Sequence, residues 1–317
     1  MLTVILGLSS SLSYALSDMV SQHVSRRIGG VVRVVFWVLA TGVALVVPLL
    51  FIVEGAGWHG EGWRGVGFAA LAGVLYIGAY FCLLAGFKRG DLSLVAALSS
   101  SQGAFAAVFA VLGGERVGLL MATGLALAIA GGVLAAVQGR AKTAAGAGWA
   151  LASGLLFALV MAAYDHADGL TWLSTAAISR VVSFALFVPI VVVVLAWERR
   201  ASAPVVPAEA AAPAAAADAA ALPALPPRPP RGLLLPPRLL GLAVVAGVFE
   251  IVGLVLVAAS IISGPLAVAG VMASQFATFA TVLGVVLLGE RPRWWRLLGV
   301  ALTIAGVSIL GVYSAPG

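Results

Sequence analysis

A single carboxylate interrupts an otherwise apolar stretch of this sequence. Residues 244–260 read VVAGVFEIVGLVLVAAS, and Glu250 is the one member that carries a charge. An acid at the centre of a membrane helix costs roughly 2.5–3.5 kcal/mol on insertion scales, so such a residue is by default a functional candidate. Because an apolar surround penalises the charged form of a carboxyl group, Glu250 could bind and release a proton there. The alternative is a structural partnership with an arginine or with backbone on a neighbouring helix.

Further polar side chains recur at helical spacing in apolar segments. Ser10, Tyr14 and Ser17 share one face of an expected helix, and polar atoms on such a face must meet protein or water rather than lipid. Tyr76 and Tyr80 are one turn apart, and Tyr76 lies 174 residues before Glu250.

Two Ser-Gln pairs and a further tyrosine complete the set of uncharged candidates: Ser101 with Gln102, Ser274 with Gln275, and Tyr164. Together the polar candidates could line a cavity for a small molecule with a polar head and an apolar or aromatic body. For each serine or glutamine alone, an interhelical hydrogen bond is the simpler interpretation.

Two more charges need placing. Arg180 lies about two turns inside an apolar segment, and a long arginine side chain can reach the membrane interface from that depth. We predict an interfacial anchor for Arg180 and for its counterpart Arg33; pairing with Glu250 or binding a substrate carboxylate is the alternative for Arg180. Asp18 lies near the end of its segment, which favours a surface role.

The composition shows which elements must position these residues. Of the 317 residues, 62% are hydrophobic and 9% charged, whereas soluble domains are about one quarter charged. Apolar runs recur that are long enough to cross the roughly 30 Å hydrocarbon layer as helices. The predicted fold is all-α, a polytopic membrane protein with ten spans at about 2–22, 34–53, 66–87, 91–112, 118–138, 147–164, 174–196, 239–261, 265–288 and 296–313.

The basic residues predict an orientation rather than a nucleic-acid partner. Of the 18 lysines and arginines, fifteen fall in the loops after spans 1, 3, 5, 7 and 9, and only Arg64 and Arg116 lie on the other side. Basic loops remain in the cytoplasm, where they face an anionic leaflet, so both termini are predicted to be external. The arginine bias and the Ala, Gly and Val richness are typical of GC-rich coding, which suggests the inner (plasma) membrane of a bacterium.

An internal repeat organises the spans. TGLALAIAGGVLAA at 123–136 aligns with LGVALTIAGVSILG at 298–311, and the segment 99–116 resembles 273–291. Each half therefore holds five spans, and because five is odd, the second half must insert upside down. The predicted repeats are 1–138 and 139–197 with 239–317, joined by a disordered Ala/Pro-rich linker at 198–238. Inverted repeats are typical of alternating-access transporters.

The chain resembles the drug/metabolite transporter superfamily, in particular its ten-helix EamA-type branch. The resemblance covers both halves and rests on GGERVG and LGERPR after spans 4 and 9, on the glycine-rich fifth span of each half, and on an arginine near the start of spans 2 and 7. It implies a secondary carrier, often an exporter, with a central cavity lined by both repeats. The linker is longer than in relatives, which commonly have cytoplasmic termini, opposite to the charge count.

We therefore expect a secondary active transporter that exports a small metabolite, amino acid or drug-like amphipathic compound by alternating access, coupled to protons through Glu250. A lipid-linked intermediate flippase is the alternative, ahead of a membrane-embedded enzyme or a channel. The single Cys82 and three scattered histidines offer no metal-ligand spacing, so no enzyme activity, metal or cofactor is predicted. The expected partners are a small molecule, the proton and the lipid bilayer, in a monomer or homodimer.

Overall fold

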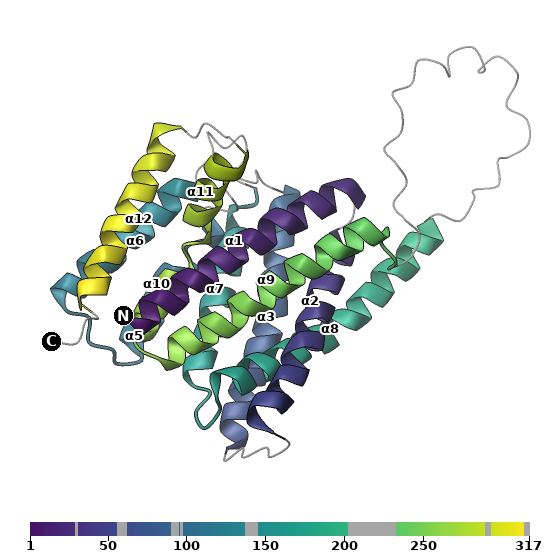
Figure 1. Cartoon of the computed structure of the whole chain (residues 1–317), viewed down its shortest axis with the longest axis horizontal. Helices are drawn as coiled ribbons and strands as arrows, with labels where there is room; N and C mark the ends of the chain where they lie inside the picture. Colours follow the sequence, from purple (N-terminus) through teal and green to yellow (C-terminus); the bar gives the residue numbers. More distant parts are fainter. Residues whose placement is uncertain are drawn as a thin grey trace, which may run out of the picture.

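The computed structural model describes residues 1–28, 31–55, 62–89, 95, 98–136, 145–201, 233–288 and 293–313. Within these ranges the chain is helical throughout, as predicted (Figure 1). The helices discussed below are α1 (Leu2–Ile28), α2 (Val31–Glu54), α3 (Trp63–Arg89), α5 (Gln102–Leu112), α6 (Leu119–Ala136), α7 (Ala147–Asp165), α8 (Trp172–Ala201), α9 (Pro237–Ile262), α10 (Leu266–Ala273), α11 (Phe276–Leu288) and α12 (Trp294–Tyr313).

The membrane-spanning character of these helices agrees with the composition. In the described part of the chain nine segments are long and apolar enough to cross a membrane, with α10 and α11 counted as one, and α5 is a shorter apolar helix. Proline starts two of the helices, because Pro236 and Pro265 occupy the N-cap positions of α9 and α10, where a missing N–H costs nothing. The fold class predicted from composition is therefore confirmed.

The ninth predicted span, 265–288, is found as a candidate membrane span at Leu266–Leu287, but it is not one unbroken helix. That span is interrupted at Ser274 and Gln275, between α10 and α11. The Ser274 hydroxyl and the Gln275 amide both donate to the Val271 carbonyl, at 2.8 and 3.0 Å. Polar side chains that bond to nearby backbone compete with the regular helix and satisfy the carbonyls that the break leaves free.

The first half has a matching interruption. Residues 100 and 101 form a turn immediately before α5, and the Ser101 hydroxyl donates to the Leu98 carbonyl at 2.6 Å. Most of the predicted span 91–112 upstream of this turn (90–94 and 96–97) lies outside the described residues. The two Ser-Gln pairs therefore both stand where a helix is broken.

The helix pairings follow a two-fold pattern. Helix α1 packs along α9 as α7 packs along α3, and α2 packs on α9 as α8 packs on α3. The pairs α2 with α8 and α6 with α12 remain the same pairs when the two halves are exchanged. Figure 1 shows α1 and α9 side by side, with α6 and α12 paired at one end of the molecule. This is the arrangement expected of two five-helix repeats.

The α6–α12 pair depends on glycine. A Cβ added at Gly131 would lie 2.5 Å from the Thr303 backbone nitrogen, and one added at Gly299 would lie 2.5 Å from the Ala135 nitrogen. No side chain fits at such distances, so the two backbones touch directly. Small residues give membrane helices this close approach, since lipid offers no hydrophobic drive for their association.

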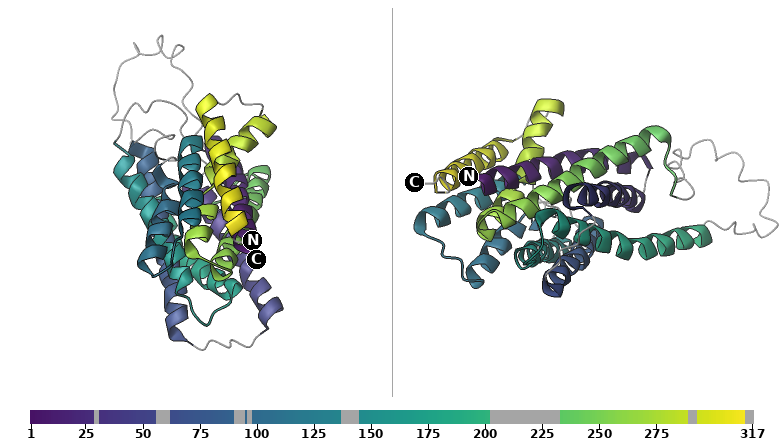
Figure 2. Two further views of the ribbon diagram at one scale, coloured as in Figure 1. Left: turned by 90° about the vertical axis from the view of Figure 1, so that its left-hand side faces the viewer. Right: turned by 60° about the horizontal axis from the view of Figure 1, so that its bottom comes forward.

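The ends of the long linker differ slightly from the prediction of 198–238. Helix α8 continues to Ala201, and α9 begins at Pro237. Residues 202–232 lie outside the described residues. The first turn of α1 and the last turn of α12 lie at the same end of the molecule (Figure 2).

Candidate functional site

Glu250 lies at the meeting point of three helices. On α9 it is 5% exposed, and its Oε1 atom accepts a hydrogen bond from Nη2 of Arg180 on α8 at 2.5 Å. The Tyr76 hydroxyl, from α3, donates to the same oxygen at 2.6 Å. A cation and a neutral donor therefore converge on one buried carboxylate oxygen. We call Tyr76, Arg180 and Glu250 the polar cluster.

The predicted interfacial anchor at Arg180 is wrong. Its side chain is 1% exposed and ends at Glu250 instead of reaching the membrane interface. The Glu250 carboxylate is close enough to form a charge-assisted hydrogen bond with Arg180, whereas the membrane interface is farther from this position in the helix. Arg33 is likewise buried, at 3% exposure, and its Nη2 pairs with Glu198 Oε2 of α8 at 2.5 Å. Both arginines are therefore buried against a carboxylate of another helix.

The space for Arg180 comes from a glycine and an aromatic ring. A Cβ added at Gly42 of α2 would lie 3.1 Å from Cδ and 3.3 Å from Nε of Arg180. On another side, the guanidinium carbon lies 5.1 Å from the centroid of the Tyr76 ring, within the range of a cation–π contact. Tyr76 therefore contacts both members of the ion pair.

Three polar atoms of the cluster are left over. Among the described residues, Nε and Nη1 of Arg180 and Oε2 of Glu250 are buried and have no hydrogen-bond partner. Each such atom carries a desolvation cost that a partner would offset. The two nitrogens could donate to a carboxylate, and the oxygen could accept from an ammonium group. The cluster can therefore still donate hydrogen bonds from Arg180 and accept one at Glu250.

The cluster lies near the pseudo-two-fold axis. Tyr76 and Glu250 are repeat equivalents, 174 residues apart, and they bond to each other directly. Equivalent positions of two related halves can touch only close to the axis that relates them. The first set of helices supplies Tyr76, whereas the second supplies Arg180 and Glu250, so the polar cluster joins the two sets.

The other predicted tyrosines surround this cluster. The Tyr80 ring lies 5.9 Å from that of Tyr76, centroid to centroid. Tyr14 packs against Gly253, where an added Cβ would lie 3.2 Å from the tyrosine ring. The Tyr164 hydroxyl donates to Ser179 Oγ at 2.9 Å, beside Arg180 in the chain. The aromatic candidates are therefore brought together by the fold.

The serines of α1 hold helices together. Ser10 donates to the Gly253 carbonyl at 2.8 Å, and Ser17 donates to the Ala246 carbonyl at 2.9 Å. These bonds join α1 to α9 over two turns. Asp18, on the same helix, has an exposed side chain, yet it interacts electrostatically with the buried Glu250.

The Ser-Gln pairs serve the helix breaks described above. Besides its bond to α10, the Gln275 amide donates to the Ala128 carbonyl of α6 at 3.2 Å, and Thr303 of α12 donates to its Oε1 at 3.3 Å. Ser274 packs against Gly103 of α5, and Gln102 is buried beside that glycine in the chain. The two Ser-Gln pairs therefore hold helices in position and do not take part in the polar cluster.

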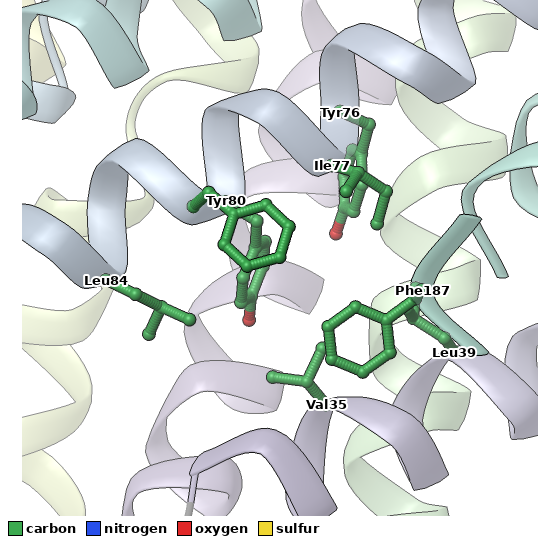
Figure 3. Close-up of a pocket in the computed structure, with 8 residues that line it drawn as sticks. Val35, Leu39, Tyr76, Ile77, Tyr80, Leu84 and Phe187 are labelled. Atoms are coloured by element: carbon green, nitrogen blue, oxygen red, sulfur yellow. The ribbon is translucent and has the colours of Figure 1, made fainter. Parts of the chain in front are cut away.

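A pocket adjoins the polar cluster between α2, α3 and α8 (Figure 3). Its cavity volume is about 10 Å³, roughly enough for one water molecule, whereas ligand sites for drug-sized molecules have roughly 300–1,000 Å³. The large central cavity implied by the family resemblance is therefore not open at this position, and the polar cluster is enclosed by protein.

Sequence reasoning missed two supporting residues. Gly42 gives Arg180 its space, and no pattern in α2 sets it apart from the other glycines. Glu115, after α5, accepts from the backbone N–H groups of Leu266 and Ala267 at 2.5 and 3.3 Å. It therefore caps the N-terminus of α10 in the other half, and its presence in the repeated GER motif was the available signal.

Comparisons with known proteins agree with this geometry. Residues 1–137 match the model of the EamA-like transporter family. The first part of this chain is therefore similar to EamA-like transporters. One solved structure, described only as "Crystal structure of protein", is 15% identical and superposes with a TM-score of 0.69 over 98% of this chain and 97% of the other. That likeness shows the fold alone. No curated protein matches the sequence.

The match indicates a coarse function. Residues 1–137 are similar to a family of transporters, and the described part of the chain has the apolar helices of a multi-pass membrane protein. A transporter of this kind would act on a small molecule, and the polar cluster brings together buried ionisable side chains of three helices.

Proposed function

We propose that this EamA-like protein is a secondary carrier that exports a small amphipathic metabolite by alternating access. The substrate carries a carboxylate, as an amino acid does, and the polar cluster binds it and couples its movement to protons. The observation that carries this proposal is the buried ion pair of Arg180 and Glu250, with unused bonding atoms on both partners.

A contribution to folding stability is a poor explanation for a buried ion pair of this kind. The attraction between two desolvated charges often fails to repay their lost hydration, and well-packed apolar residues commonly do as well. Ionisable residues inside membrane helices mark transport paths for the same reason. The unpaired Nε and Nη1 atoms of Arg180 are free to donate to a substrate carboxylate, and a bidentate bond to it would also use Nη2, which Glu250 now occupies.

Coupling follows from competition for Arg180. When a substrate carboxylate takes the guanidinium, Glu250 loses its cationic partner and binds one proton. When the substrate leaves, Arg180 returns to Glu250, and the proton is released. The proton and the substrate are therefore bound at the same time and cross the membrane in the same direction, and the Tyr76 hydroxyl can stay bonded to Oε1 in both states.

The helix arrangement supports a two-state movement. The cluster joins helices of both sets, and inverted repeats that rock about a central site are the common design of secondary transporters. The interruptions at 100–101 and 274–275 give two spans a joint at which their halves can tilt separately.

Flux in reconstituted vesicles tests the proposal. Proteoliposomes would receive a mixture of the twenty radiolabelled amino acids, with and without an imposed pH gradient. We expect gradient-stimulated flux with the wild type, its loss in Glu250→Gln, and its retention in the control Asp165→Asn, whose acid lies at the end of α7. Gradient-driven flux that is unchanged in Glu250→Gln would reject the coupling role.

A further inference from the structure

Six helices form two three-helix bundles that are related by the two-fold pattern. Helices α1 and α2 pack along α9, and helices α7 and α8 pack along α3 (Figure 1). Exchanging the two halves converts one bundle into the other, since α1, α2 and α9 correspond to α7, α8 and α3. We call them the α9 bundle and the α3 bundle. Each bundle therefore takes two helices from one repeat and the third helix from the other repeat.

Inside each bundle the helix backbones touch directly. In the α9 bundle, a Cβ added at Gly247 would lie 3.0 Å from the Val38 carbonyl oxygen of α2. In the α3 bundle, a Cβ added at Gly73 would lie 2.6 Å from the Ser179 carbonyl oxygen of α8, and Ser183 donates to the Gly73 carbonyl at 3.0 Å. Gly73 and Gly247 are repeat equivalents, 174 residues apart. Backbone contacts of this kind leave the helices little freedom, so each bundle should move as one unit.

The contacts between the two bundles are of another kind. They lie mainly along α2 and α8, and side chain bonds to side chain across this boundary. The polar cluster is one such contact, because Glu250 belongs to the α9 bundle whereas Arg180 and Tyr76 belong to the α3 bundle. Side-chain hydrogen bonds can exchange partners without moving the helices within a bundle. This boundary is therefore the place at which two rigid bundles can separate.

Two further polar contacts join the bundles at the ends of the boundary. At the start of α2, Arg33 Nη2 pairs with Glu198 Oε2, near the end of α8, at 2.5 Å. At the end of α2, the Glu54 carboxylate accepts from the Ser174 hydroxyl at 2.6 Å and from the Thr171 hydroxyl, both at the start of α8. About 30 Å of helix separates Arg33 from Glu54, which is roughly the thickness of the hydrocarbon layer. The two contacts therefore close the boundary near opposite faces of the membrane.

We propose that these two contacts are the gates of the protein, and that the α9 and α3 bundles rock against each other about the polar cluster. Gly42, which contacts Arg180, lies between the gates on α2. Opening one gate while the other stays closed exposes the cluster to one side only. Both gates are closed in this structure, which explains why the cluster is enclosed. The inference rests on the proposed function, and it makes the moving unit a bundle of mixed origin instead of a sequence repeat.

Distances between spin labels at the two ends of the boundary test the gates. Cys82 is the only cysteine in the sequence, so Cys82→Ser provides a thiol-free background. Val31→Cys with Trp197→Cys would report on the gate at the start of α2. Ile52→Cys with Trp172→Cys would report on the gate at its end. Each pair labels exposed positions on α2 and α8, and double electron–electron resonance would measure both distances in nanodiscs, without substrate or pH gradient.

Weakening one gate should open that end alone. Glu198→Gln removes the charge of the first gate, and Ser174→Ala removes a donor of the second. Each variant should add a longer distance at its own end and keep the wild-type distance at the other. The longer-distance population should grow roughly tenfold, because a hydrogen bond to a charged group contributes at least that factor to an equilibrium.

Two further variants serve as checks. Arg33→Met/Glu198→Leu removes the first gate without leaving an unpaired charge, and it should open the same end as Glu198→Gln. Ser308→Ala, which removes an exposed hydroxyl on α12, should change neither distance. Unchanged distances in all the gate variants, or lengthening at both ends or at the opposite end, would overturn the inference.

The two proposals fail in different ways. If the amino-acid mixture is transported but the gate variants leave both distances unchanged, then the gate inference alone is wrong. If each variant opens its own end while no gradient-driven flux of any substrate is found, then the gates stand and the carrier proposal fails.

Discussion

At the scale of single residues, Arg180 and Glu250 depend on each other for their burial. Both side chains are almost fully excluded from solvent, and the charge of each is balanced mainly by the charge of the other. Removing one partner of such a pair leaves a buried, uncompensated charge, which costs about 3–5 kcal/mol, whereas removing both charges together is often neutral.

Arg180→Met should therefore destabilise the protein, and the double variant Arg180→Met/Glu250→Gln should recover most of the loss. Thermal unfolding in detergent would measure this, with the single variant melting well below the wild type and the double variant melting close to it. Transport should be absent from both, because the site has lost its cation. A single variant that is as stable as the wild type would contradict the proposed dependence.

The residues of the cluster were partly predictable. Glu250 stands out as an acid in an apolar span, and its repeat partner Tyr76 follows from the offset between the halves. The partner of Arg180 could not be deduced in the same way. From its position in the span, the Arg180 side chain could reach either the membrane interface or the protein interior. Which of the two it reaches depends on the rotation of α8 relative to its neighbours, and a single sequence does not reveal that rotation.

At the scale of helices, the contact of α6 with α12 sets a limit on side-chain size. Gly131→Ala places a methyl group where only 2.5 Å separates it from the α12 backbone. We expect a loss of about 1–3 kcal/mol in stability, the usual cost of overpacking, and a lower melting temperature. Gly241→Ala in α9 is the matched control, because nothing lies within 4 Å of its added Cβ. It should melt at or slightly above the wild-type temperature, since alanine favours helix.

A second prediction concerns the short helix α10. Its N-terminal N–H groups bond to the Glu115 carboxylate, which also complements the helix dipole. Glu115→Ala should cost about 1 kcal/mol, as the loss of a helix cap usually does, and Glu115→Gln, which keeps an acceptor oxygen, should cost less. Hydrogen exchange at Leu266 and Ala267 reports this directly: exchange should be faster in the alanine variant, and equal rates in all three proteins would refute the capping role.

The helix breaks show why element boundaries were harder to predict than element types. Residues 266–288 are apolar enough throughout to form one span, and hydropathy averages over the two polar residues at its centre. The decisive event is local, because Ser274 and Gln275 bond back to Val271. The same Ser-Gln pair in both halves was visible in the sequence, and we interpreted it there as a cavity lining.

At the scale of the whole molecule, ten predicted spans would place both ends of the chain on one side of the membrane, and the first turn of α1 and the last turn of α12 do lie at the same end of the molecule. The distribution of lysine and arginine predicts that this side is external. A phosphatase fused to the C-terminus should therefore be active, and a fluorescent protein fused there should stay dark. As a control, the same fluorescent protein inserted in the linker at 202–232 should fluoresce. A bright C-terminal fusion would reverse the orientation.

The central claim is that the polar cluster becomes open to water from each side of the membrane in turn. Ser183→Cys in the Cys82→Ser background tests it, because Ser183 is 1% exposed and lies one turn from Arg180. A charged, membrane-impermeant thiol reagent would be added to one side of oriented vesicles at a time, with lipid-facing Ser308→Cys as the control. The account predicts labelling of Ser183→Cys from both sides and of Ser308→Cys from neither. Labelling of Ser183→Cys from neither side would contradict it, and Arg180 and Glu250 would then be a packing feature.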